Sequence, residues 1–162
     1  MTGVLEWLEA TTVGVLVRES LWGFQIVVGV HILGIALSVG TLVWLDLRLL
    51  GVAMRDTPVA TVYRYVMPWA FVGFVIMFAT GLALATGFAT RAYVNLFFRL
   101  KIAALVLAGI NAAVYHLGVE RRIAEWNEDQ LPPVPARAAG LISIAMWASI
   151  ILAGRMMAYT MY

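Results

Sequence analysis

Four long stretches of the chain are apolar and uncharged, and the short segments between them carry most of the charged residues. The stretches cover residues 21–45, 65–90, 102–119 and 138–154. A membrane-spanning helix needs about 20 mostly apolar residues. The last two stretches are shorter, but the basic side chains that flank them can snorkel to the membrane surface, so their helices can run a turn further. The pattern therefore predicts an all-α fold, a transmembrane four-helix bundle.

We expect the whole chain, residues 1–162, to form a single membrane domain, because no connection is long enough for a second one. Pro68 fits the first turn of the second span, where a missing N–H costs little. The connection before the last span ends in a proline-rich run, which favours an extended link. The predicted spans lie at about residues 21–46, 65–89, 98–121 and 137–160.

The segment before the first span has a different pattern. Its apolar residues between positions 4 and 8 share one helical face, from which Glu6 and Glu9 are turned away. This pattern predicts a short amphipathic helix in the membrane interface, at about residues 3–17. Thr11 and Thr12 are suited to break this helix and to cap its next turn. A frayed tail is the alternative interpretation.

Composition supports the membrane assignment and excludes several classes of function. Hydrophobic residues make up 63% of the chain and charged residues 12%, against about 45–50% and 25% in a soluble domain. The net charge of +2 is too small to attract a nucleic acid, so we expect the lipid bilayer to be the main partner. The basic residues divide almost evenly between the two sides, which leaves the orientation open.

The chain has two histidines, and both lie within predicted spans. Intramembrane ionisable residues are costly and usually face a bundle interior or a functional site. Small residues share a helical face with each histidine: Gly34 and Ser38 with His31, and Ala112 and Ala113 with His116. The first and third spans run parallel, and their midpoints place the two histidines at depths that differ by about 9 Å.

Two imidazoles beside small residues are suited to hold a non-covalent haem b between helices. The chain has no cysteine, which excludes iron–sulfur clusters, thiolate zinc sites and covalent haem attachment. We therefore expect His31 and His116 to ligate the iron of one haem b per chain, or of two haems if the difference in depth is real. Arg48 and Arg64 are the nearest candidates to bind the propionates. The alternative is that both histidines only bridge helices and that the arginines snorkel to lipid headgroups.

With both axial positions filled, such a haem would relay electrons. The sequence therefore predicts a membrane-embedded b-type cytochrome. We expect an electron carrier or a subunit of an oxidoreductase in preference to a stand-alone enzyme. Its partner would be quinone or a redox protein, with Gln25 and Asn111 as candidate quinone contacts, and glycine-rich faces would favour a homodimer. The alternative function is a cofactor-free structural subunit or small transporter.

The chain contains the motifs His31-Ile-Leu-Gly34, Asp46-Leu-Arg48-Leu-Leu-Gly51, Met67-Pro68-Trp69 and Phe98-Arg99-Leu100-Lys101, followed by Asn111 and His116. With these residues the sequence resembles an uncharacterised bacterial family of four-span inner-membrane proteins, which is similar in style to small b-type cytochromes. The resemblance covers almost the whole chain and implies the fold and a multi-pass location in the bacterial inner (cytoplasmic) membrane, but it implies no activity.

Overall fold

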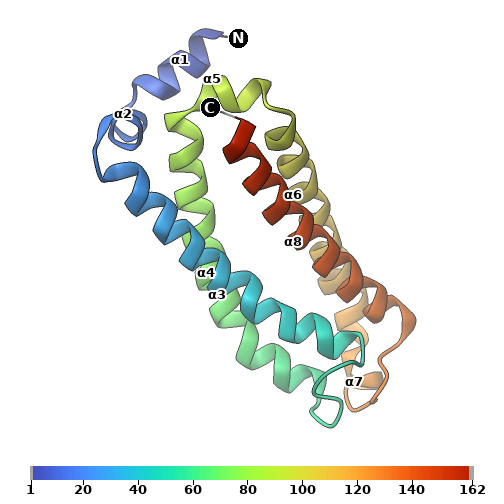
Figure 1. Cartoon of the computed structure of the whole chain (residues 1–162). Coiled ribbons are helices and arrows are strands. Elements are labelled where there is room, and N and C mark those ends of the chain that lie inside the picture. Colours follow the sequence, from blue (N-terminus) through green and yellow to red (C-terminus); the bar gives the residue numbers. More distant parts are fainter. Residues whose placement is uncertain (1, 161–162) are drawn as a thin grey trace.

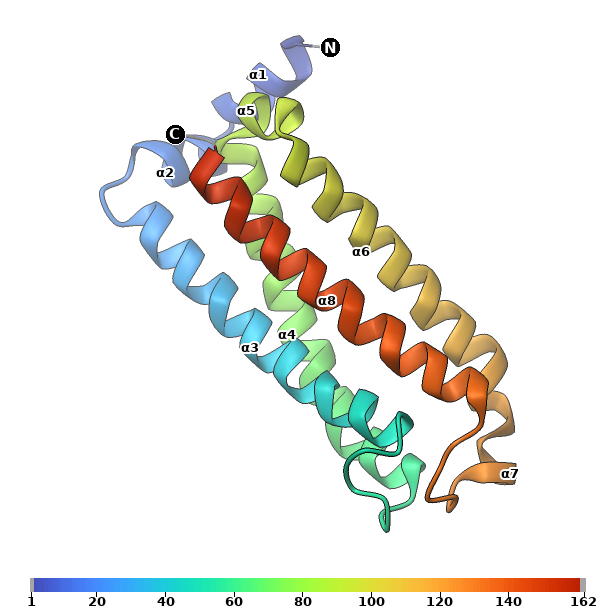
Figure 2. The same ribbon diagram turned by 45° about the vertical axis from the view of Figure 1, so that its right-hand side comes forward.

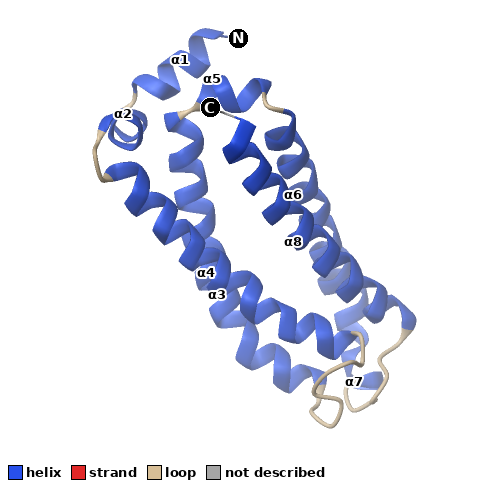
Figure 3. Ribbon diagram, viewed as in Figure 1, coloured by secondary structure: helices blue, strands red, loops and turns tan. Residues whose placement is uncertain are grey.

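The chain folds into helices and short loops, and a computed structural model describes residues 2–160 (Figures 1 and 3). Residues 1, 161 and 162, the ends of the predicted domain, lie outside the described part. The described residues contain no strand, which confirms the all-α prediction. The elements are α1 (Thr2–Ala10), α2 (Thr12–Glu19), α3 (Gly23–Leu49), α4 (Val59–Gly87), α5 (Ala89–Val94), α6 (Leu96–Val114), the π-helix η1 (Tyr115–Val119), the 3-10 helix η2 (Glu120–Arg122), α7 (Ile123–Trp126) and α8 (Val134–Thr160).

Four helical segments are long and apolar enough to cross a membrane, as predicted: α3, α4, the run Leu96–Trp126 and α8. They contain 27 to 31 residues, more than the roughly 20 that a span needs. The second span begins at Val59, six residues before the uncharged stretch from residue 65. The third span continues through η1, η2 and α7 to Trp126, past the expected end at residue 121. The chain is therefore a multi-pass membrane protein.

The prediction for Pro68 was wrong, because α4 starts earlier than the charge pattern indicates. Pro68 lies in the helix interior, ten residues after Pro58, which directly precedes the helix. The uncharged stretch begins only after Arg64, whereas the helix already contains Arg64. The proline therefore removes one backbone hydrogen bond from the interior of a spanning helix. Membrane helices tolerate such a proline, because neighbouring helices and side chains can satisfy the freed backbone group.

The four spans form two pairs, α3 with α4 and α6 with α8, and the pairs meet through α3 and α8 (Figures 1 and 2). In Figure 1 the end of α3 and the start of α8 lie near α7, and α5 joins α4 to α6 at the opposite end of the bundle. Two clusters of buried side chains lie at different depths. The first, next to the α7 end, includes Leu45, Val59 and Tyr115. The second includes Val39, Met77 and Trp147.

Glycines allow the closest contacts between helices. A Cβ on Gly73 would lie 2.4 Å from the backbone nitrogen of Ser38, and a Cβ on Gly34 would lie 2.9 Å from that of Met77. The backbones of α3 and α4 therefore touch, as small residues permit in a membrane. Gly140 likewise allows close contact between α8 and α3, since a Cβ there would lie 2.9 Å from the carbonyl oxygen of Asp46.

The two loops at the α7 end are fastened to each other by Arg48, whose side chain is fully buried. Its Nε donates to the carbonyl oxygen of Thr57 at 2.7 Å, and its Nη2 donates to that of Asp129 at 2.9 Å. Asn127 adds two contacts to the start of α4, because its backbone carbonyl accepts from Val59 and its side-chain oxygen from Ala60. These bonds hold the α3–α4 loop against the α7–α8 loop.

The amphipathic N-terminal segment is helical but consists of two helices. The break falls at Thr11, whose hydroxyl accepts from the backbone N–H of Gly14 and so caps α2. This is the break and cap that the sequence predicts. Glu9 accepts a hydrogen bond from the backbone of Thr90, which attaches the segment to α5.

We predict that Gly73→Ala lowers the stability of the protein by about 1–3 kcal/mol, because the added methyl group forces α3 and α4 apart. Thermal unfolding of the detergent-solubilised protein measures the effect. Gly40→Ala is the matched control, since a Cβ at Gly40 of α3 meets nothing within 4 Å. Equal melting temperatures for the two variants would contradict the close contact between α3 and α4.

Candidate functional site

A cavity of about 520 Å³ lies between α3, α4, α6 and α8. Most of its wall is apolar and includes Leu42 of α3, Phe74 and Phe78 of α4, Leu105 of α6 and Trp147 of α8. The closely packed helix pairs are α3–α4, α6–α8 and α3–α8, so α4 and α6 face each other across the cavity without packing closely. The bundle therefore contains an apolar space in its membrane-spanning part.

Polar groups gather at the end of this cavity that lies toward α7. The hydroxyl of Ser143 donates to a carboxylate oxygen of Asp46 at 2.7 Å, and Asp46 is only 3% exposed. The side chain of Asn111 donates to the backbone carbonyl of Ala139 at 3.0 Å. Each of these bonds joins α8 to another helix.

The hydroxyl of Tyr115 differs from its neighbours, because it has no hydrogen-bond partner although the residue is only 6% exposed. Tyr115 also lines the cavity. A buried hydroxyl without a partner costs about 1–3 kcal/mol. The cavity therefore contains a hydrogen-bonding group that the protein itself does not satisfy.

His116 lines the same cavity and is next to Tyr115 in the π-helix η1. Short π-helical turns within α-helices occur frequently at functional sites. The Nδ1 atom of His116 hydrogen-bonds to the carboxylate of Glu120, one turn further along the chain. A carboxylate accepts, so Nδ1 carries the proton, and in the neutral ring Nε2 keeps its lone pair. Ligating histidines typically have this arrangement, with one nitrogen held by a carboxylate and the other free to bind a metal.

His31 is half-buried and contacts α4 instead of the cavity. Its Nδ1 lies 2.9 Å from the hydroxyl oxygen of Thr80. That hydroxyl donates its one proton to the carbonyl oxygen of Ile76 at 2.6 Å, so it accepts from Nδ1 of His31. A Cβ on Gly81 would lie 3.2 Å from the ring, so the imidazole is close against α4. His31 therefore bridges α3 and α4.

The two histidines contact α4 at different depths, and the structure does not bring them together. The ring of His116 lies 5.9 Å from that of Tyr63, centroid to centroid, whereas His31 contacts Thr80. These two residues of α4 are 17 positions apart, or about 25 Å along a helix. Two nitrogens on one metal ion lie only roughly 4 Å apart. One iron shared by both imidazoles does not fit this arrangement.

The small residues next to the two histidines have different environments. Gly34 and Ser38 are buried against Gly73 of α4, so the space beside them is filled by helix packing. Ala112 lines the cavity as expected. Ala113 does not belong to the cavity lining, and both alanines are exposed. Room for a flat ligand therefore exists beside His116 and not on the Gly34–Ser38 face of α3.

Neither arginine predicted to bind propionates lines the cavity. Arg48 uses its Nε and Nη2 for the carbonyl groups of the two loops. Arg64 is exposed, with its guanidinium 5.6 Å from the ring centroid of Tyr65. The structure thus gives Arg48 a role in loop closure and places Arg64 on the surface.

Sequence reasoning missed four residues of this site: Asp46, Ser143, Tyr115 and Glu120. Glu120 had a readable signal, because it follows His116 by four residues and so lies on the same helical face. Asp46 was taken as the charged end of a span, whereas α3 continues to Leu49. Nothing in the sequence shows that Tyr115 lacks a partner. In the described part of the chain, no three side chains of His, Asp or Glu form a cluster that could hold a metal ion alone.

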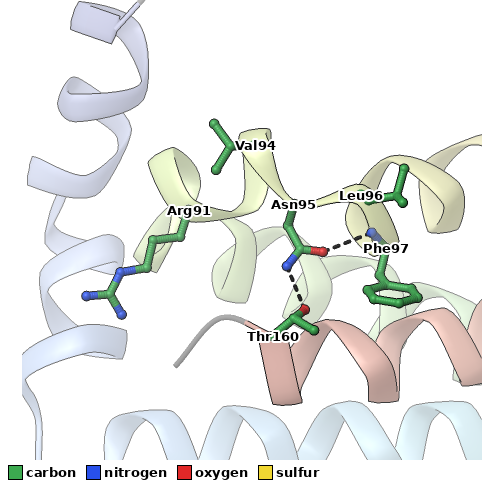
Figure 4. A pocket seen from close by; sticks show the side chains of 6 residues that line it. All are labelled: Arg91, Val94, Asn95, Leu96, Phe97 and Thr160. Atoms are coloured by element: carbon green, nitrogen blue, oxygen red, sulfur yellow. Dashed lines mark hydrogen bonds between the residues drawn. The ribbon is translucent and has the colours of Figure 1, made fainter.

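A second hollow lies where α5 meets α6, near the end of α8 (Figure 4). Two of its polar side chains, Asn95 and Thr160, are paired with each other. The side chain of Asn95 donates to the hydroxyl of Thr160 at 2.8 Å and accepts from the backbone of Phe97 at 2.9 Å, which caps α6. Asn95 in this hollow therefore serves as the N-cap of α6.

Comparison with known proteins adds the family and no activity. Residues 4–160 match a family of unknown function, DUF6644. Neither the comparison with curated proteins nor the comparison with solved structures returned a match. The matched region includes all four spans and the cavity residues. The chain therefore belongs to the family of unknown function DUF6644.

Proposed function

We propose that this protein is a membrane-embedded b-type cytochrome that binds haem b in the cavity through Nε2 of His116 and transfers electrons. One observation carries the proposal: the imidazole of His116 lines an apolar cavity while its Nδ1 is held by Glu120. This is the hydrogen-bonding pattern of a metal-ligating histidine. Haem b supplies one-electron redox chemistry when bound.

Three features of the cavity support a haem-like occupant. Its walls are apolar, as suits a macrocycle, and its volume is about 520 Å³. A Cβ on Gly109, which lines the cavity, would meet no atom within 4 Å, so this part of the wall is open. The unpaired hydroxyl of Tyr115 offers a hydrogen bond to a polar group of the ligand. The absence of cysteine from the sequence requires non-covalent binding.

The proposal includes the electron partners expected from the sequence. The donor or acceptor would be quinone or a partner redox protein in the bacterial inner membrane, and a homodimer is compatible with the exposed apolar faces. Asn111, one of the two candidate quinone contacts, has its amide bonded to Ala139, which favours a helix-bridging role for this residue. His31 serves in this proposal as a helix-bridging residue and not as a ligand of the same iron.

A cofactor-free structural subunit or small transporter is the second candidate. The observation that favours it is that His31, Asp46 and Asn111 each hydrogen-bond to a neighbouring helix. Polar residues within membranes commonly have this role. It does not account for the unpaired hydroxyl of Tyr115 or for the cavity around it.

We predict that the protein purified from haem-replete cells has a Soret band and, on reduction, a resolved α band. His116→Ala removes the proposed ligand and should abolish this spectrum. His31→Ala is the comparison variant, since it breaks a contact with α4 at a different depth and should keep the haem of His116. A colourless wild-type protein would contradict the proposal and favour the cofactor-free candidate. Loss of haem from His31→Ala alone would contradict the choice of ligand.

We also predict that Glu120→Ala weakens haem binding about 10- to 100-fold, because residues that orient a ligating histidine typically have effects of this size. Titration of the haem-free protein with haemin measures the dissociation constant. Glu125→Ala, which removes an exposed carboxylate of α7 close by, is the control and should leave the constant unchanged. Equal affinity in both variants would show that Glu120 does not position His116.

A further inference from the structure

An iron held by His116 would have one protein nitrogen ligand, because no second histidine lines the cavity. The remaining lone pairs of the cavity lining belong to Asp46, Ser143, Tyr115, Asn111 and Met67. We propose that the thioether sulfur of Met67 is the second axial ligand, which gives a His–Met haem. The inference rests on the proposed function and names a residue that neither the sequence pattern nor the family assigns.

Met67 lies about one helical turn along α4 from Tyr63, the residue of this helix that contacts His116. It follows Tyr63 by four residues on α4, so the two side chains share one face of the helix. The ring of Tyr63 is 5.9 Å from that of His116. Met67 also packs against the buried cluster that contains Tyr115, the neighbour of His116. The two proposed ligands are therefore within about one helical turn of each other along the bundle.

The two residues also approach the cavity from different sides. Met67 belongs to α4 and His116 to the third span, and these two spans are not one of the closely packed helix pairs. Both side chains line the cavity between them. A flat ligand placed in this space would have an imidazole from the third span and a thioether from α4.

The chemistry of the other candidates favours methionine. The carboxylate of Asp46 accepts from Ser143, and the amide of Asn111 donates to Ala139, so these groups already have partners in the protein. A thioether is a weak hydrogen-bond acceptor, so it loses little when it binds a metal. Haem iron with Met and His ligands is a known electron-transfer arrangement, in which methionine raises the reduction potential. The site would then exclude external ligands and relay electrons.

The test uses the purified, haem-loaded protein. In the wild type we expect a low-spin ferric haem with the near-infrared charge-transfer band of thioether ligation in magnetic circular dichroism. Met67→Leu conserves volume and should fold. It should convert the haem to the high-spin form, allow the reduced protein to bind carbon monoxide and lower the midpoint potential. Met77→Leu is the matched control, because Met77 is buried in the other cluster of the same helix and does not line the cavity.

Met67→His supplies a second variant that does not depend on the first. It should restore a six-coordinate, low-spin haem with a potential below that of the wild type. A wild-type haem without the thioether band, or an unchanged low-spin spectrum in Met67→Leu, would overturn the role of Met67 while leaving haem binding intact. A wild-type protein that lacks haem would overturn the proposed function itself, so the two failures are distinguishable.

Discussion

The structure depends on one constraint: a polar side chain within the membrane must find its partner inside the protein. Three helix-to-helix hydrogen bonds meet this requirement, from His31 to Thr80, from Ser143 to Asp46 and from Asn111 to Ala139. They join α3 to α4, α3 to α8 and α6 to α8, which are also the closely packed pairs. Among the described residues, two buried polar side-chain atoms lack a hydrogen-bond partner, Nη1 of Arg48 and the hydroxyl of Tyr115. Of these two residues only Tyr115 lines the cavity, next to His116, whose Nε2 keeps its lone pair in the neutral ring.

Helix packing explains why the space lies beside His116 and not beside His31. Glycines bring α3 and α4 into backbone contact next to His31, whereas α4 and α6 stay apart around the cavity. Arg48 holds the α3–α4 loop and the α7–α8 loop together, and so closes the bundle at its α7 end. The site is therefore a consequence of where small residues permit contact and where larger apolar side chains keep the helices apart.

The charge pattern was sufficient to predict the four spans, because long uncharged stretches have no other stable environment. It did not predict their ends, since Arg64 and Glu120 lie inside helical segments that continue past them. The depth difference of about 9 Å between the histidines rested on the predicted midpoints of the first and third spans, and the third span continues past its predicted end. The difference became about 25 Å of helix once Thr80 and Tyr63 were known as contacts. Gly34 and Ser38 were misjudged because small residues serve close helix packing as well as ligand binding.

In the proposed function the iron lies in the cavity, next to His116 and Tyr63. X-ray diffraction from the haem-loaded protein at the iron absorption edge locates the metal directly, without a variant. We expect one anomalous peak per chain, bonded to Nε2 of His116, with Glu120 still hydrogen-bonded to Nδ1. A peak bonded to His31 near Thr80, or haem-loaded crystals with the iron outside the bundle, would contradict the proposed function.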